Sequence, residues 1–304
     1  MSTPRRTVNA GLASLILSPL TPTVPAAARS GLFAESFGRL PAWCLVPRDL
    51  DQSQPMLVAV HGISRDARAQ INAFQSVAHG TGRIVIAPRF TNSRFNGYQR
   101  PGVDEQRADD ALIGLIRILN QRYGLRTGAI DLFGFSGGAQ FAHRFAMQYP
   151  NLIARLVVAS AGWYTFPYEH RRYPYGLKTG ENPGVDLISR LDPFLRLPIL
   201  TLVGSRDNQR DATLRTGPRL DLEQGRHRLE RARRWVQALH EAAQRRGIRP
   251  DVSLRLIAQC GHDFDRCARE GNLVNEVVQW LMRPGSASSQ SDQNVDWPGI
   301  NADT

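Results

Sequence analysis

The chain has 304 residues, of which 42% are hydrophobic, which is enough to bury one large core. Its formal net charge of +11 raises the question of an anionic partner such as nucleic acid or a membrane surface. No zinc-site spacing, aromatic-laced basic strand or helix-turn-helix pattern accompanies this charge, so nucleic-acid binding is not expected.

The first 28 residues have the order of an export signal. Arg5 and Arg6 precede an uncharged, moderately apolar segment, and the small residues Ala26-Ala27-Ala28 follow it. The segment is interrupted by prolines and is shorter than the roughly 20 apolar residues that span a bilayer. We therefore expect it to be removed from an exported, periplasmic or secreted bacterial protein. The paired arginines resemble a twin-arginine signal, but Thr7-Val8-Asn9 departs from that pattern, and the general secretory route stays open.

Short apolar runs alternate with amphipathic stretches between residues 29 and 283. Six runs have the composition of buried parallel strands: Met56 to Val60, Arg83 to Ala87, Ala129 to Phe133, Arg155 to Ala159, Pro198 to Val203 and Val252 to Ile257. Helical patterns cover Glu105 to Tyr123, Ala139 to Tyr149 and Leu273 to Met282. This alternation predicts an α/β domain with a mostly parallel, doubly wound sheet and helices on both faces.

The stretch from Trp163 to Arg196 is long, aromatic and irregular. An insertion of this length predicts a lid or a pocket wall. Its candidate wall residues are Trp163, Tyr164, Phe166, Tyr168, Tyr173 and Tyr175. Aromatic faces would suit an acyl chain, an aromatic acid or a sugar ring, whereas any single residue could instead pack the insertion onto the domain.

Many of the arginines lie in the stretch from Gly225 to Gly247. Apolar residues recur there at helical spacing, at Leu229, Ala232, Val236, Leu239 and Ala243. The pattern predicts a helix whose arginine side chains form a solvated outer face.

Three cysteines and a polar tail complete the chain. Cys260 and Cys267 are close enough to form a disulfide in an oxidising compartment, which would leave Cys44 unpaired. A metal site is not expected, because Cys260, His262 and Cys267 lack a second ligand pair at zinc-site spacing. Residues 284–304 are rich in Ser, Gln, Asp and Asn without periodicity, and we expect a disordered tail.

The stretch DLFGFSGGAQFAH places Ser136 between glycines where an apolar strand ends and a helical pattern begins. A sharp turn from strand to helix strains its middle residue and needs small neighbours, here Gly134, Gly137 and Gly138. The motif predicts a nucleophilic serine exposed at the edge of the sheet.

A serine nucleophile needs a histidine base and a carboxylate that orients the histidine. Both follow in that order directly after apolar strands, as Asp207 and His262. Asp211 is a rival for the acid, whereas Asp263 neighbours His262 and would be awkwardly placed. The backbone amides of Gly137 and Ile63 are the expected oxyanion donors, and His61 is expected to shape the loop that carries Ile63.

Residues 40 to 283 resemble the α/β-hydrolase superfamily in their HG loop, GFSGG turn, and acid and histidine after the last two strands. Within it the layout resembles exported esterases of the polyhydroxyalkanoate depolymerase and feruloyl-esterase type. The resemblance implies a serine hydrolase that cleaves small or polymeric carboxylic esters through an acyl-enzyme, without a cofactor. A serine peptidase is the alternative, with Glu169 or Glu181 as anchors for a peptide terminus, and a non-catalytic binding protein of the same fold is less favoured. The oligomeric state is not predicted.

Overall fold

The structure is a computed structural model that describes residues 28–102, 106–180 and 186–283. The expected export signal, apart from Ala28, and the expected polar tail lie outside these residues. In the described part of the chain, no helix is long and apolar enough to cross a membrane.

The described residues form one eight-stranded sheet in the order β1-β2-β4-β3-β5-β6-β7-β8. The strands are β1 (Gly31–Phe37), β2 (Leu40–Val46), β3 (Leu57–Val60), β4 (Val85–Pro88), β5 (Ile130–Phe135), β6 (Ile153–Ala159), β7 (Ile199–Gly204) and β8 (Val252–Ile257). Strands β3 to β8 pair in parallel, whereas β2 is antiparallel to both of its neighbours. The six expected strands and the mostly parallel sheet are confirmed.

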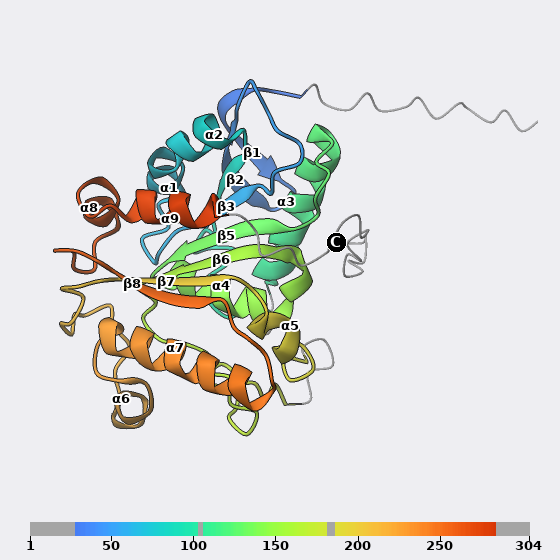
Figure 1. Ribbon diagram of the computed structural model, residues 1–304. Helices are drawn as coiled ribbons and strands as arrows, with labels where there is room; N and C mark the ends of the chain where they lie inside the picture. The colour runs from blue at the N-terminus through green and yellow to red at the C-terminus, as the bar shows by residue number, and fades with distance from the viewer. Residues whose placement is uncertain (1–27, 103–105, 181–185, 284–304) are drawn as a thin grey trace, which may run out of the picture.

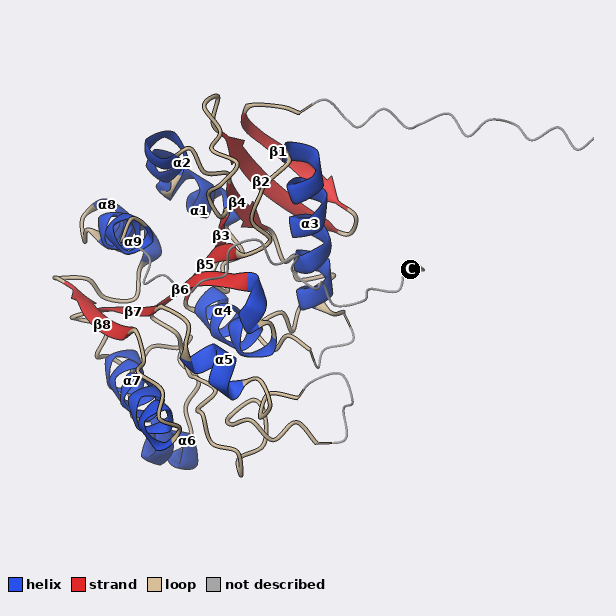
Figure 2. Cartoon of the chain, turned by 45° about the vertical axis from the view of Figure 1, so that its right-hand side comes forward, coloured by secondary structure: helices blue, strands red, loops and turns tan. Residues whose placement is uncertain are grey.

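Helices cover both faces of the sheet and enclose two separate cores (Figures 1 and 2). One face carries α1 (Ala67–Ala73), α2 (Gln75–Thr81), α8 (Phe264–Arg269) and α9 (Leu273–Leu281). The other carries α3 (Ala108–Tyr123), α4 (Gly137–Gln148), α5 (Leu191–Leu195) and α7 (Arg228–Arg245). The short elements η1 (Pro150–Leu152) and α6 (Pro218–Gln224) complete the chain. Because the strands run in parallel, the loops after β3, β5, β7 and β8 meet at one edge of the sheet.

The hairpin of β1 and β2 was not predicted from the sequence. Only two of the seven residues of β1 are buried, because the strand lies at the edge of the sheet. It therefore has no continuous apolar run of the kind that marks a central strand.

The prediction that the aromatic segment forms a pocket wall is wrong for its first residues. Trp163, Tyr164 and Phe166 are all at least 95% buried. The Tyr164 ring stacks on Trp235 of α7, and the Arg144 guanidinium of α4 lies over the Trp163 ring. These side chains attach the segment to the helices beneath it, so they contribute to the core.

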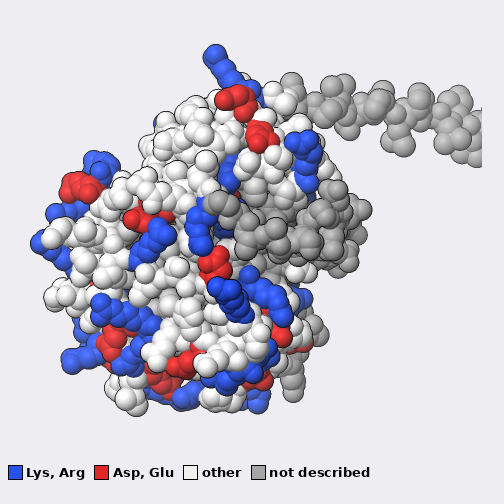
Figure 3. Space-filling view, viewed as in Figure 1, with Lys and Arg blue, Asp and Glu red and all other residues white. Residues whose placement is uncertain are grey.

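Basic side chains on the outer surface are interspersed with acidic ones, as the face in Figure 3 shows. Two arginines of α7 do not belong to this surface. Arg228 and Arg231 are 1% and 0% exposed, contrary to the expected solvated face. Both guanidinium groups bind carboxylates and backbone carbonyls or hydroxyls in the interior, which compensates for their burial.

Candidate active site

Ser136 lies at the turn between β5 and α4, with φ of 54° and ψ of −113°. A left-handed φ is unfavourable for a serine and is maintained here by close packing of the turn. A Cβ atom on Gly134 would lie 2.3 Å from the Gly138 carbonyl oxygen, and one on Gly138 would lie 2.2 Å from the Val60 carbonyl oxygen. Both glycines are therefore required by the close approach of β3, β5 and α4.

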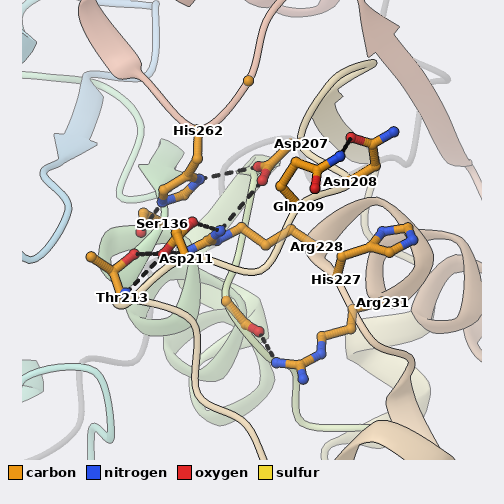
Figure 4. Close-up of polar contacts among 12 residues, drawn as sticks. Ser136, Asp207, Asn208, Gln209, Asp211, Thr213, His227, Arg228, Arg231 and His262 are labelled. Carbon is orange, nitrogen blue, oxygen red and sulfur yellow. Dashed lines mark hydrogen bonds and ion pairs between the residues drawn. The ribbon is translucent and has the colours of Figure 1, made fainter.

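The structure brings Ser136, His262 and Asp207 into one hydrogen-bonded chain (Figure 4). The Nε2 atom of His262 lies 2.9 Å from Ser136 Oγ, and its Nδ1 atom lies 3.1 Å from Asp207 Oδ2. With the proton on Nδ1, the ring donates to Asp207 and accepts the serine hydroxyl proton at Nε2. This is the geometry in which a histidine acts as a general base toward a serine.

The two rival carboxylates have other roles. Asp211 binds Arg228 and Thr213, and its pKa is lowered chiefly by the hydrogen bond from Arg228. Asp263 caps α8, because its side chain accepts a hydrogen bond from the Arg266 amide. The structure therefore favours Asp207 as the partner of His262.

Neighbouring loops fix the positions of Asp207 and His262. The Asp207 amide donates to the Gly204 carbonyl at 3.0 Å in the turn after β7. A Cβ atom on Gly204 would lie 2.3 Å from the Cys260 carbonyl oxygen, so Gly204 allows the loop after β8 to approach. The His262 ring stacks on Phe135 with centroids 5.2 Å apart. The side chain of His262 is 16% exposed, whereas that of Asp207 is 1% exposed.

Arg228, at the start of α7, is the site residue that the sequence did not indicate. Its Nη1 atom lies 3.4 Å from Asp207 Oδ1 and 2.5 Å from Asp211 Oδ2, and its Nη2 atom donates to Thr213 Oγ1 at 2.8 Å. Figure 4 shows its guanidinium between the two aspartates. The helical pattern contained one signal, since Arg228 lies four residues before Ala232 and therefore on the face expected to be buried.

The expected oxyanion donors, the amides of Ile63 and Gly137, lie near each other beside Ser136. A Cβ atom on Gly137 would be 3.3 Å from the Ile63 nitrogen. Among the described residues, neither amide donates a hydrogen bond to the protein. Two free amides next to the serine are suited to bind an oxyanion.

His61 supports this oxyanion loop. Its Nδ1 atom donates to the Gly62 carbonyl at 2.8 Å, and its Nε2 atom accepts a hydrogen bond from the Phe90 amide at 3.0 Å. Burial lowers the pKa of His61 to about 4. The ring is therefore neutral and structural, in agreement with the expectation.

A cavity of about 290 Å³ opens beside Ser136 and His262. Its walls come from the loops after β3 and β8, from Thr213, and from the first turn of α1. It has apolar walls at Ile63, Phe135 and Phe264, and three carboxylates, Asp66, Asp263 and Asp265. None of the aromatic residues expected from the 163–196 segment lines this cavity.

The expected disulfide between Cys260 and Cys267 is not formed. All three cysteines are buried free thiols. The Cys267 thiol contacts the Gly261 carbonyl at 3.5 Å, and the side chains of Cys260 and Cys267 belong to the same core beside the His262 loop. Within the described residues, no three His, Cys, Asp or Glu side chains are grouped as metal ligands.

Solved structures show the class of the fold. The sheet order, the strained serine after β5 and many structural matches define an α/β-hydrolase fold. A poly(aspartic acid) hydrolase from Sphingomonas sp. KT-1 is 22% identical with a TM-score of 0.73, over 84% of this chain and 99% of that one. A poly(3-hydroxybutyrate) depolymerase from Bordetella parapertussis is 24% identical with a TM-score of 0.68, and the match covers 79% of this chain and 88% of the depolymerase.

A more distant structural relative is an acetyl xylan esterase from Aspergillus awamori. It is 13% identical with a TM-score of 0.51, over 83% of this chain and 99% of that one. No protein-family model and no curated protein sequence matches the chain.

Proposed function

We propose that the chain is a serine hydrolase that cleaves carboxylic esters. The observation that carries the proposal is the continuous hydrogen-bonded chain from Ser136 through His262 to the buried Asp207. His262 takes the Ser136 proton while Oγ attacks the carbonyl carbon, and the resulting oxyanion accepts hydrogen bonds from the amides of Ile63 and Gly137. The imidazolium then protonates the departing alcohol, which leaves an acyl-enzyme on Ser136.

The same groups complete the reaction. A water molecule donates its proton to His262 as it attacks the acyl carbon, and collapse of the second tetrahedral intermediate returns the proton to Ser136. The carboxylic acid leaves and the enzyme is regenerated. Every step uses side chains and amides of this chain, so the proposed mechanism needs no cofactor.

Ester cleavage is the favoured reaction because several structural neighbours are named as ester-cleaving enzymes, including the depolymerase and the acetyl xylan esterase. The peptidase alternative has no support from the described residues. Glu169, one candidate anchor for a peptide terminus, is paired with Arg246, and Glu181 lies outside the described residues.

The test is hydrolysis of p-nitrophenyl acyl esters, aminoacyl amides and polyester emulsions by the wild type and by Ser136→Ala. We expect ester turnover by the wild type and a loss of at least about 10⁴-fold in kcat for the variant. Equal turnover by the two proteins would reject Ser136 as the nucleophile. Amide cleavage without ester cleavage would favour a peptidase.

The walls of the cavity indicate which esters are preferred. Asp66, Asp263 and Asp265 line it, and no Arg or Lys is among its lining residues. A carboxylate on the substrate would be repelled there, whereas a cationic group would be attracted. We propose that the site prefers neutral or cationic esters to anionic ones, in contrast with the basic charge of the whole chain.

Three phenyl esters with acyl chains of matched length test this preference. They carry 4-(trimethylammonio)butyrate, its neutral isostere 5,5-dimethylhexanoate, and glutarate with one free carboxylate. At low salt we expect kcat/KM to fall about threefold at each step in that order, and the differences to shrink in 0.5 M NaCl.

The matched variants are Asp265→Asn and Asp49→Asn. Each removes one exposed carboxylate, but Asp49 follows β2 at the opposite end of the parallel strands from Ser136. Only Asp265→Asn should reduce the ratio of kcat/KM for the cationic ester to kcat/KM for the anionic ester. A glutarate ester hydrolysed as fast as the cationic one at low salt would contradict the proposed preference.

We further propose that the enzyme acts outside the cytoplasm. The order of Arg5-Arg6, an apolar segment and Ala26-Ala27-Ala28 supports export. Mass spectrometry of the protein from periplasmic and culture fractions should detect a chain that begins after Ala28. A chain in those fractions that still carries Met1 would contradict cleavage.

A further inference from the structure

Asp207 divides its two carboxylate oxygens between two partners. Oδ2 accepts a hydrogen bond from His262 Nδ1 at 3.1 Å, and Oδ1 lies 3.4 Å from Arg228 Nη1. Within the described residues, the other hydrogen bonds of Asp207 are made by its backbone, with Gly204 and Leu229. Arg228 and His262 therefore fix the rotation of this buried carboxylate together.

We infer that Arg228 is a positioning residue, which orients Asp207 toward His262 and reduces the negative charge that the imidazole ring experiences. The inference rests on the proposed function, because it assigns a role within the same constellation of Ser136, His262 and Asp207.

The geometric part of the inference follows from burial. The side chains of Asp207 and Arg228 are each 1% exposed, so water cannot readily replace either partner. Without Arg228, Oδ1 would be a buried carboxylate oxygen with no partner among the described side chains. The carboxylate would then rotate or shift to regain a donor, and the bond to His262 would be lengthened.

The electrostatic part follows from the charges in the cluster. Asp207 and Asp211 each contribute −1 and Arg228 contributes +1, so the cluster carries a formal charge of −1. Removal of Arg228 leaves −2, and neutralisation of Asp211 leaves 0. A more negative cluster stabilises the imidazolium form of His262, and a less negative one destabilises it.

Other titratable groups near Asp207 do not compete in the neutral pH range. Burial raises the pKa of Tyr164 and that of the Cys267 thiol, and the charge of Asp207 contributes to both shifts. Both groups therefore stay neutral. The three cavity carboxylates, Asp66, Asp263 and Asp265, also face His262, and they are unchanged in every variant described below.

The experiment follows the titration of the His262 ring by NMR in the wild type and in three variants. In Arg228→Met we expect the midpoint to move to higher pH by about half a unit to one unit. In Asp211→Asn the midpoint should move to lower pH by a few tenths of a unit. This variant should fold, because the Asp211 side chain is 40% exposed. Arg228→Lys retains the charge and should leave the midpoint near that of the wild type.

Arg231→Met is the matched control. Arg231 lies one turn further along α7 and is equally buried, but it binds Asp221 and backbone carbonyls, and it points away from the cluster in Figure 4. Its loss should lower the melting temperature without moving the His262 midpoint. Thermal unfolding of each variant separates loss of stability from the change in titration.

Kinetics provide the second readout. In both Arg228 variants kcat should fall about tenfold or more, because neither Lys nor Met can bind Asp207 with one guanidinium nitrogen while the other binds Thr213. The acid limb of kcat/KM should move only in Arg228→Met and Asp211→Asn, in the directions given by NMR. Unchanged His262 midpoints in Arg228→Met and Asp211→Asn would overturn the inference. A wild type that titrates as expected but cleaves no ester would reject the proposed function alone.

Discussion

The loops after β3 and β8 face each other across the cavity, and each carries a histidine beside a strand end. In the loop after β8, His262 is partly exposed and binds a serine hydroxyl and a carboxylate. In the loop after β3, His61 is fully buried and binds two backbone groups.

The comparison shows that position at a strand end does not decide the role of a histidine. Both nitrogens of His61 are occupied by a carbonyl and an amide, and burial lowers its pKa to about 4. It can neither accept a proton from a substrate nor reach Ser136. His262 lines the cavity and is hydrogen-bonded to the Asp207 carboxylate, so it can exchange a proton during a reaction.

The largest effect is expected for His262→Gln. Without a base, Ser136 Oγ keeps its proton, and kcat for ester hydrolysis should fall about 10⁴-fold. The free energy of unfolding should fall by about 1 to 3 kcal/mol, because the ring loses its contact with Phe135 and leaves Oδ2 of the buried Asp207 without its donor. Steady-state kinetics and urea unfolding at pH 7.5 measure the two quantities.

His79→Gln is the control for this change, because His79 is an exposed histidine of α2. It should affect neither activity nor stability. If His262→Gln kept more than a tenth of the wild-type kcat, the proton transfer would have to be assigned to another group. The assignment of His262 as the base and His61 as a structural residue would then be contradicted.

Much of the fold and of this constellation was predictable from the sequence. The six central strands are short apolar runs, because parallel strands are buried on both faces. Ser136, Asp207 and His262 could be found because each follows such a run, in the chain order that this fold requires. Gly134 and Gly138 could be recognised because only glycine fits so close to another backbone.

The cavity walls were not predictable in the same way. Trp163, Tyr164 and Phe166 follow a strand end, yet tertiary packing under α4 and α7 buries them. Arg228 was missed because helical spacing tells which face is apolar, but not that an arginine at its border meets two aspartates from another loop. Both outcomes depend on contacts between segments far apart in the sequence, which a local pattern does not contain.

A smaller effect, on stability, is expected for His61→Gln. The unfolded chain binds a proton at His61 below about pH 6.5, whereas the folded chain does so only near pH 4. Folding stability contributed by this group is therefore complete above pH 6.5 and is lost as the pH falls toward 4. His61 should account for a loss of about 2 kcal/mol in the free energy of unfolding between pH 7.5 and pH 5.

Urea unfolding at pH 7.5, 6 and 5 measures this slope. His61→Gln should be less stable at pH 7.5, because the Phe90 amide loses its acceptor, and it should show a weaker dependence on pH. Part of the slope should remain, because burial also lowers the pKa of His143. An identical slope in the wild type and in His61→Gln would contradict a lowered pKa for His61.

The smallest effect is expected for Ile63→Ala, in the loop after β3. The Ile63 side chain is 48% exposed and lines the cavity, so it should contribute an apolar contact to a bound substrate. Its backbone amide is the proposed hydrogen-bond donor to the oxyanion. Truncation should raise KM for p-nitrophenyl butyrate roughly threefold, because a few methyl and methylene groups lose contact with the acyl chain. The kcat should stay unchanged, since the backbone amide is retained. Ile118→Ala removes another exposed isoleucine, which is 37% exposed on α3 and does not line the cavity, and it should change neither constant. A fall in kcat without a rise in KM for Ile63→Ala would mean that the side chain positions the oxyanion loop rather than the substrate.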